Sequence, residues 1–165
     1  MPSWSRDREN THTHTYDSYN KSNGSSPTVN IDSVFLTGVR DAHERRAVAI
    51  LDIQNAFLHA ENNEYVLMFL CGELAELLVK VDPSLYRNYV ITSKQGVPML
   101  YVKLTKALCG ILRSAMLFYN NIRGHLEGKS LKVNPYEPCV ANKLVNGSQI
   151  NVCWHVGDLK ISHIE

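Results

Sequence analysis

The fold is decided by the stretch Asn146-Gly147-Ser148-Gln149-Ile150-Asn151-Val152-Cys153-Trp154-His155-Val156-Gly157-Asp158-Leu159-Lys160-Ile161-Ser162. The dipeptide Asn146-Gly147 between two apolar-rich runs is the strongest short-range hairpin signal in the chain. It predicts strands over residues 139–145 and 149–155. A third strand, over residues 159–164, would pair back across a tight turn at Gly157-Asp158. The stretch therefore predicts an antiparallel sheet.

The segments upstream supply helices and further strands. Val34, Phe35, Val39 and Ala42 recur at helical spacing, with Asp32 or Ser33 as the cap and with Arg40, Glu44, Arg45 and Arg46 facing water. The apolar run over residues 47–51 predicts a buried central strand that ends at Asp52. Further elements are expected as a short helix over 56–60, a strand over 65–70, a helix over 74–81, a strand over 100–104 and a long helix over roughly 105–127.

These elements predict an α+β fold, in which a small antiparallel sheet is backed by two or three helices. Residues 1–27 are polar and predict a disordered tail, whose His12-x-His14 pair is interpreted as solvated, and residues 28–165 form the domain. The 165 residues are 44% hydrophobic and 20% charged, which is ordinary for a globular domain. The net charge of +1 argues against a strong polynucleotide binder, because such domains usually carry a large basic excess.

Cysteine usage and hydropathy indicate the compartment. The four cysteines show no CxxC spacing, so they are expected as reduced core thiols in an intracellular protein, cytoplasmic or nuclear. Cys153-x-His155 offers only two ligands on one strand, and a zinc site is disfavoured. The first residues contain no apolar run typical of a secretory signal, and no segment reaches the ~20 apolar residues of a membrane span. We therefore expect no secretion and no membrane partner.

Two carboxylates could carry chemistry. Asp52 ends one predicted strand and Asp158 lies in a turn between two others. If these strands are neighbours in one sheet, both side chains reach the same edge, where clustered carboxylates could hold the metal ions of phosphoryl transfer. An aspartate at a strand end or in a turn is, however, more often a turn residue.

Four segments carry a more specific resemblance. The run Asp52-Ile53-Gln54-Asn55-Ala56-Phe57-Leu58 resembles the first polymerase motif of Ty1/copia-type retrotransposon reverse transcriptases, an aspartate followed by x-x-Asn-Ala-Phe-Leu. Residues 104–111 resemble the Leu-Lys-Lys-Ala-Leu-Tyr-Gly-Leu segment of that family, residues 134–140 its Asp-Pro-Cys-Val segment, and residues 155–159 its Tyr-Val-Asp-Asp-Leu segment. Their order and spacing are similar to the family's, over about residues 29–165.

The resemblance implies roles for individual residues. Asp52 and Asp158 would be catalytic ligands of Mg²⁺ or Mn²⁺ in an RNA-directed DNA polymerase. Asn55 and Ala56 would contact the phosphates of the incoming dNTP, and Phe57 would lie under its sugar. The partners would be an RNA or DNA primer–template, with the rest of a polyprotein possible. The implied fold is a palm with incomplete fingers and no thumb.

Gly157 stands where the family has the first aspartate of its pair. A glycine in a tight turn is structurally benign because it accepts a positive φ without cost. For chemistry the change is severe: losing a group that merely supports a metal ligand costs about 10–100-fold in affinity, so losing a ligand should cost more. Other departures from the family's residues are Cys109, the segment 112–116, Phe118 and His155.

The resemblance therefore predicts a polymerase palm with little or no activity. One alternative is a non-catalytic remnant, or a nucleic-acid-binding module, with the same fold. Another is a protein unrelated to polymerases, in which Asp52 and Asp158 are ordinary turn residues.

Overall fold

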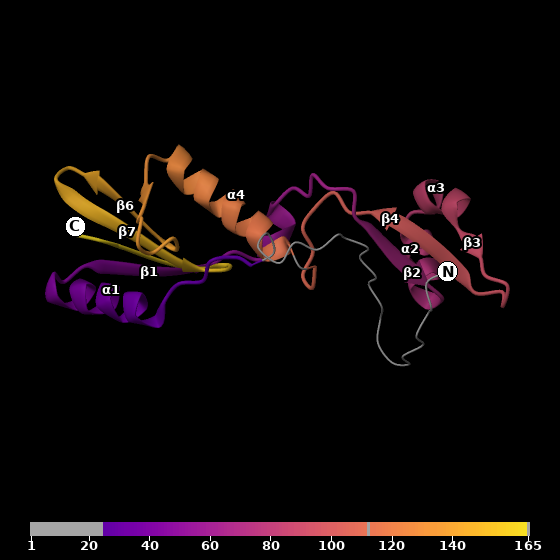
Figure 1. Ribbon diagram of the computed structural model, residues 1–165, viewed down its shortest axis with the longest axis horizontal. Helices are drawn as coiled ribbons and strands as arrows, with labels where there is room; N and C mark the ends of the chain where they lie inside the picture. Colours follow the sequence, from indigo (N-terminus) through magenta and orange to yellow (C-terminus); the bar gives the residue numbers. More distant parts are fainter. Residues whose placement is uncertain (1–24, 112, 165) are drawn as a thin grey trace. The chain divides into compact units, whose positions relative to one another are not determined.

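The computed structural model describes residues 25–111 and 113–164 (Figure 1). The prediction of a disordered tail falls outside these residues, except for residues 25–27, which form no regular structure. The described chain divides into two compact units, one of residues 25–63 and 105–164 and the other of residues Glu64–Leu104. Both combine helices with antiparallel strands. The predicted α+β class is confirmed.

The larger unit is built on a five-stranded antiparallel sheet in the order β1-β8-β7-β6-β5. The strands are β1 (Ala47–Asp52), β5 (Lys132–Val133), β6 (Val140–Val145), β7 (Ser148–His155) and β8 (Asp158–His163). Asn146 and Gly147, with φ of 50° and 81°, connect β6 to β7. Both angles lie in the left-handed region that Asn and Gly tolerate best. The hairpin predicted from this dipeptide is confirmed.

Helices α1 (Ile31–His43) and α4 (Ser114–Gly128) lie on opposite faces of this sheet (Figure 1). The apolar core lies between the sheet and α4, together with the short helix η2 (Ala56–His59). Asn151, Val152, Cys153 and Trp154 are all buried in β7, so both faces of this central strand are covered. The largest members of this core are Phe118, Tyr119, Ile122, Val152, Trp154 and Leu159.

The face toward α1 is held by charged and polar contacts. Asp41 is 5% exposed, and its carboxylate lies 2.5 Å from the ammonium group of Lys160 on β8. The same ammonium donates a hydrogen bond to Thr37 Oγ1 at 2.9 Å. At the N-terminus of α1, the Glu137 carboxylate accepts hydrogen bonds from the Asn30 N–H and the Ser33 hydroxyl. These contacts fix α1 to β8 and to the entry of β6.

The smaller unit is a three-stranded antiparallel sheet in the order β2-β4-β3. Its strands are β2 (Leu67–Cys71), β3 (Ile91–Thr92) and β4 (Pro98–Lys103), and its helices are α2 (Glu73–Val81), α3 (Pro83–Tyr86) and η3 (Arg87–Tyr89). Helix α2 ends before Pro83, as predicted, because the residue preceding a proline disfavours the helical conformation. Asp82 then caps α3, since its side chain accepts a hydrogen bond from the Leu85 N–H.

Three predictions about these elements were wrong. Strand β1 is not central: it lies at the end of its sheet, and Val48, Ile50 and Leu51 are exposed. An apolar run is typical of a central strand, but the run alone does not say whether a neighbouring strand covers it. Helix α4 begins at Ser114 rather than near residue 105, because Gly110 has a φ of 90°, which an α-helix cannot contain.

Arg46 is the third correction. It was expected to face water but is 8% exposed. The preceding Arg45 takes a left-handed φ of 50°, which turns the chain out of α1. The Arg46 guanidinium then donates to the Glu44 carboxylate and to the Gln149 carbonyl, each at 2.7 Å. Burial of this charge is tolerated because its Nε and Nη1 groups donate hydrogen bonds to oxygen acceptors and Glu44 supplies an opposite charge.

Within the described residues, no helix combines the length and the apolar character that crossing a bilayer requires.

Candidate metal-binding site

The two aspartates singled out from the sequence meet on neighbouring strands. Strands β1 and β8 pair in antiparallel register, and Asp52, the last residue of β1, lies directly opposite Asp158, the first residue of β8. Directly opposite residues point to the same face, with Cβ atoms about 4.5–5.5 Å apart. Both side chains are exposed. The structure therefore brings two carboxylates together at one end of the sheet, open to solvent.

Gly157 lies against the segment that follows Asp52. The Ile53 N–H donates a hydrogen bond to the Gly157 carbonyl at 2.8 Å. A Cβ atom at position 157 would lie 3.6 Å from Asp52 Oδ1, 3.2 Å from the Cβ of Ala56 and 3.2 Å from the carbonyl oxygen of Ile53. A side chain at this position would therefore begin beside the Asp52 carboxylate, after its neighbours shift by a few tenths of an ångström.

The turn does not need glycine for its backbone. Val156 takes the left-handed conformation, with φ of 52°, and the φ of Gly157 lies outside that region. The explanation expected from the sequence, that glycine supplies a positive φ at position 157, is therefore wrong. What distinguishes Gly157 is its closeness to Asp52, Ile53 and Ala56.

The predicted substrate-binding residues form the loop after Asp52. Asn55 has a left-handed φ of 55°, and its carbonyl accepts a hydrogen bond from the Leu58 N–H at 2.8 Å, which starts η2. The Phe57 ring is half-buried and packs edge-on against Phe118 of α4, with centroids 6.0 Å apart. Asn55 is exposed, whereas Ala56 is half-buried beside Gly157.

A segment that the sequence did not indicate as a neighbour, residues 105–107, packs beside the end of this loop. Residues 105–107 run antiparallel to residues 60–62: the Ala107 N–H donates to the Ala60 carbonyl and the Asn62 N–H to the Thr105 carbonyl, each at 2.9 Å. Lys106 forms an ion pair with Glu61. The Ser114 hydroxyl then bonds both the carbonyl and the N–H of Leu108, which holds the chain at the start of α4. Only a buried serine after a glycine-containing turn could have signalled this contact.

The donor set does not fit a two-metal centre. Within residues 25–111 and 113–164, no group of three or more His, Cys, Asp or Glu side chains is placed to hold a metal ion. Two carboxylates, such as Asp52 and Asp158, are as many as a hydrated Mg²⁺ ion commonly takes from a protein. Two ions about 3.5–4 Å apart require more carboxylate oxygens than these residues supply.

The disfavoured zinc alternative gains no support from the thiol. Cys153 is 5% exposed, and burial raises the pKa of its thiol. The protonated thiol is a poor ligand, because metals bind the thiolate. His155, two residues further, is exposed.

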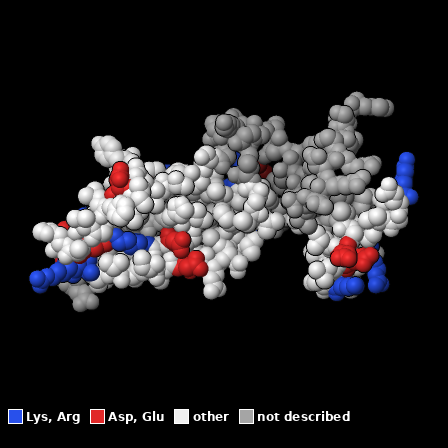
Figure 2. Space-filling model, turned by 90° about the horizontal axis from the view of Figure 1, so that it is seen from below, with Lys and Arg blue, Asp and Glu red and all other residues white. Residues whose placement is uncertain are grey.

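Charge on one face of the described residues is mixed. On the face shown in Figure 2, acidic and basic side chains of the described residues lie in small groups separated by uncharged surface, without a continuous basic stripe. Proteins that grip a nucleic-acid backbone usually present such a stripe.

No family model, curated protein or solved structure matches this chain with significance.

Proposed function

We propose that this chain has the palm of a Ty1/copia-type reverse transcriptase and that its metal site, lacking one carboxylate, does not sustain templated nucleotidyl transfer. The observation that carries the proposal is the position of Gly157. An aspartate there would start 3.6 Å from Asp52 Oδ1 and would complete a cluster of three carboxylates with Asp52 and Asp158.

The contacts among the four similar segments support the family proposal. Leu51 and Asp52 of the first segment pair with Leu159 and Asp158 of the last segment, through strands β1 and β8. Residues 60–62 also run beside residues 105–107. Residues 134–140 lead into β6, which pairs with β7. These contacts between segments that are far apart in sequence support the proposal that the segments belong to one site.

The first experiment measures metal affinity, because metal binding, unlike primer extension, does not require the fingers and thumb of a polymerase. Mn²⁺ is titrated into the chain, into Gly157→Asp and into the matched control Gly157→Ala, with free Mn²⁺ measured by electron paramagnetic resonance. Gly157→Asp should bind at least about tenfold more tightly than the other two, since a lost supporting group alone costs about 10–100-fold. Adding Asp52→Asn to Gly157→Asp should remove this gain. Equal affinity of all variants would contradict the proposal.

The second experiment is primer extension with Mg²⁺ or Mn²⁺. The unmodified chain should extend no primer, and robust extension would contradict the proposed inactivity. If Gly157→Asp gains metal affinity without extension, Gly157 is one of several lesions. Binding of a primer–template duplex, followed against salt concentration, separates an inert remnant from a binding module, because phosphate contacts weaken steeply with salt.

A further inference from the structure

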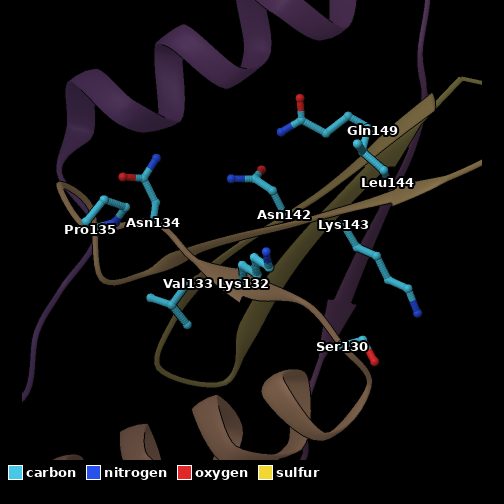
Figure 3. A pocket seen from close by; sticks show the side chains of 9 residues that line it. All are labelled: Ser130, Lys132, Val133, Asn134, Pro135, Asn142, Lys143, Leu144 and Gln149. Carbon is cyan, nitrogen blue, oxygen red and sulfur yellow. The ribbon is translucent and has the colours of Figure 1, made fainter. Parts of the chain in front are cut away.

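A hollow of about 640 Å³ lies on the larger unit, away from the two aspartates. It is formed by strands β5 and β6, the beginning of β7 and the loop segments that flank β5 (Figure 3). In the strand order β1-β8-β7-β6-β5, the hollow lies at β5 and β6, whereas Asp52 and Asp158 lie on β1 and β8 toward the other edge of the sheet. It is therefore a separate site.

The lining is basic and rich in carboxamides. It contains two lysines and three carboxamides and no carboxylate, the residues being Ser130, Lys132, Val133, Asn134, Pro135, Asn142, Lys143, Leu144 and Gln149. The lining also exposes apolar surface, so a ligand that matches it combines a negatively charged group with an apolar part.

The register places the polar groups on one face. Lys132 lies opposite Asn142, Asn142 opposite Asn151, and Leu144 opposite Gln149, so that these side chains share the face of the sheet toward α1. Figure 3 shows the carboxamides of Asn134, Asn142 and Gln149 on this side of the strands. The hollow thus presents several hydrogen-bonding groups to one ligand.

Several of these groups have no partner within the described residues. Lys132 makes no ion pair there, whereas Lys143 donates to the Lys129 carbonyl at 2.8 Å. The hollow therefore offers the Lys132 ammonium group beside the carboxamides of Asn142 and Gln149.

We propose that this hollow binds a nucleotide, either free or as a unit of a single strand. The Lys132 ammonium would contact the phosphate. Asn142 and Gln149, each with a donor and an acceptor, would contact the edge of the base, as carboxamides do with adenine. Pro135 and Leu144 provide apolar surface beside these groups. The proposal does not depend on the metal site or on the polymerase resemblance.

The test uses AMP, inorganic phosphate and a fluorescein-labelled oligo(dA) strand as probes. AMP and phosphate are titrated by NMR, and the strand is followed by fluorescence anisotropy. The variants are Lys132→Gln and Asn142→Ala, and Lys80→Gln, an exposed lysine of the smaller unit, is the matched charge control. Circular dichroism verifies that each variant is folded. Lys132→Gln should weaken binding about tenfold, because a charge-assisted hydrogen bond is lost.

The probes separate the two sources of the ligand. Saturable AMP binding indicates a free nucleotide, and binding of the strand alone indicates single-stranded nucleic acid; both support the proposal. Asn142→Ala should weaken AMP binding without weakening phosphate binding. Equal effects of Lys132→Gln and Lys80→Gln, equal affinity for phosphate and AMP, or no binding at all would overturn it. Loss of AMP binding in Asp52→Asn would also overturn it, since the ligand would then occupy the aspartate site.

Discussion

Two turns in the same sheet have the same length, but only in the first do the residue types suit the backbone conformation. Asn146 and Gly147 connect β6 to β7, and Val156 and Gly157 connect β7 to β8. In the first turn both residues are left-handed, and both are types that tolerate this conformation. In the second turn the left-handed residue is the β-branched Val156, although a glycine stands next to it. The backbone conformation thus explains the residue types of the first turn, but it does not explain those of the second.

The difference indicates what each turn does. A β-branched residue with a positive φ is a true outlier, and such strain persists only where surrounding structure imposes it. The second turn is held by the Ile53 N–H, which donates to the Gly157 carbonyl, and by the Asp52–Asp158 register. The first turn extends from the sheet, and both of its residues are exposed. Strain at the turn beside the two aspartates fits the proposal that it once served a site.

The largest expected effect comes from the core beneath the second turn. Trp154 is 2% exposed and stacks on Tyr119, with ring centroids 6.2 Å apart, whereas Leu144, near the first turn, is 72% exposed. Trp154→Ala should lower the free energy of unfolding by about 3–5 kcal/mol, because it leaves a cavity in the core. Leu144→Ala should change it by less than about 0.5 kcal/mol. Urea unfolding measures both, and similar losses would show that the two turns rest on equally packed structure.

The second effect is a pH dependence of stability that arises from the Cys139 thiol, at the start of the first hairpin. Burial raises the pKa of the Cys139 thiol from its ordinary value of 9.0 to about 11 and also raises that of Cys153. Cys139 directly precedes β6, and its carbonyl accepts a hydrogen bond from the Trp154 N–H at 3.0 Å. A buried thiol with a raised pKa stays protonated in the folded state after the unfolded chain has lost its proton.

The stability gained from this thiol is complete below pH 9 and is lost as the pH rises from 9 to 11. At about 1.4 kcal/mol for each pH unit, the loss amounts to roughly 2–3 kcal/mol. Urea unfolding at several pH values should show this slope in the unmodified chain and a smaller one in Cys139→Ala. Cys71→Ala, which changes an exposed thiol, is the control. An unchanged slope in Cys139→Ala would contradict the assignment.

The third prediction compares the two glycines directly. Gly147→Ala should cost about 1 kcal/mol, because alanine must adopt a φ of 81°. Gly157→Ala should be nearly neutral, within about 0.5 kcal/mol: the left-handed penalty is absent, and reduced chain entropy in the unfolded state offsets the close contacts with Ala56 and Ile53. Thermal unfolding of both variants under one condition measures the difference. A larger loss for Gly157→Ala would show that the close contacts outweigh the backbone.

The hairpin elements could be predicted because their signals are local. Asn146-Gly147 specifies its own turn, and Asp82-Pro83 ends α2. The α+β class and the pairing of Asp52 with Asp158 followed from the same strand pattern, although the pattern left open whether the strands were neighbours.

The features that escaped prediction depend on contacts between distant segments. The edge position of β1 is not determined by the residues Ala47–Asp52, because burial depends on which strands come alongside. Arg46 is buried because the Gln149 carbonyl, 103 residues away, accepts its hydrogen bond. The space for a side chain at position 157 is likewise limited by Ile53 and Ala56, which are distant in sequence. The conformational preferences of single residues cannot predict such contacts.

The smallest expected effect tests the strain itself. Val156→Gly should raise the free energy of unfolding by about 0.5–1 kcal/mol, since the relief of a left-handed β-branched residue exceeds the entropy that glycine adds to the unfolded chain. Asn146→Gly is the matched control, and it should be nearly neutral because asparagine already tolerates its φ of 50°. Urea titration gives both values. Destabilisation by Val156→Gly would mean that the valine side chain, 38% exposed, contributes more by packing than its backbone costs. The second turn would then be as well matched to its sequence as the first, and the argument from strain for a former site would fail.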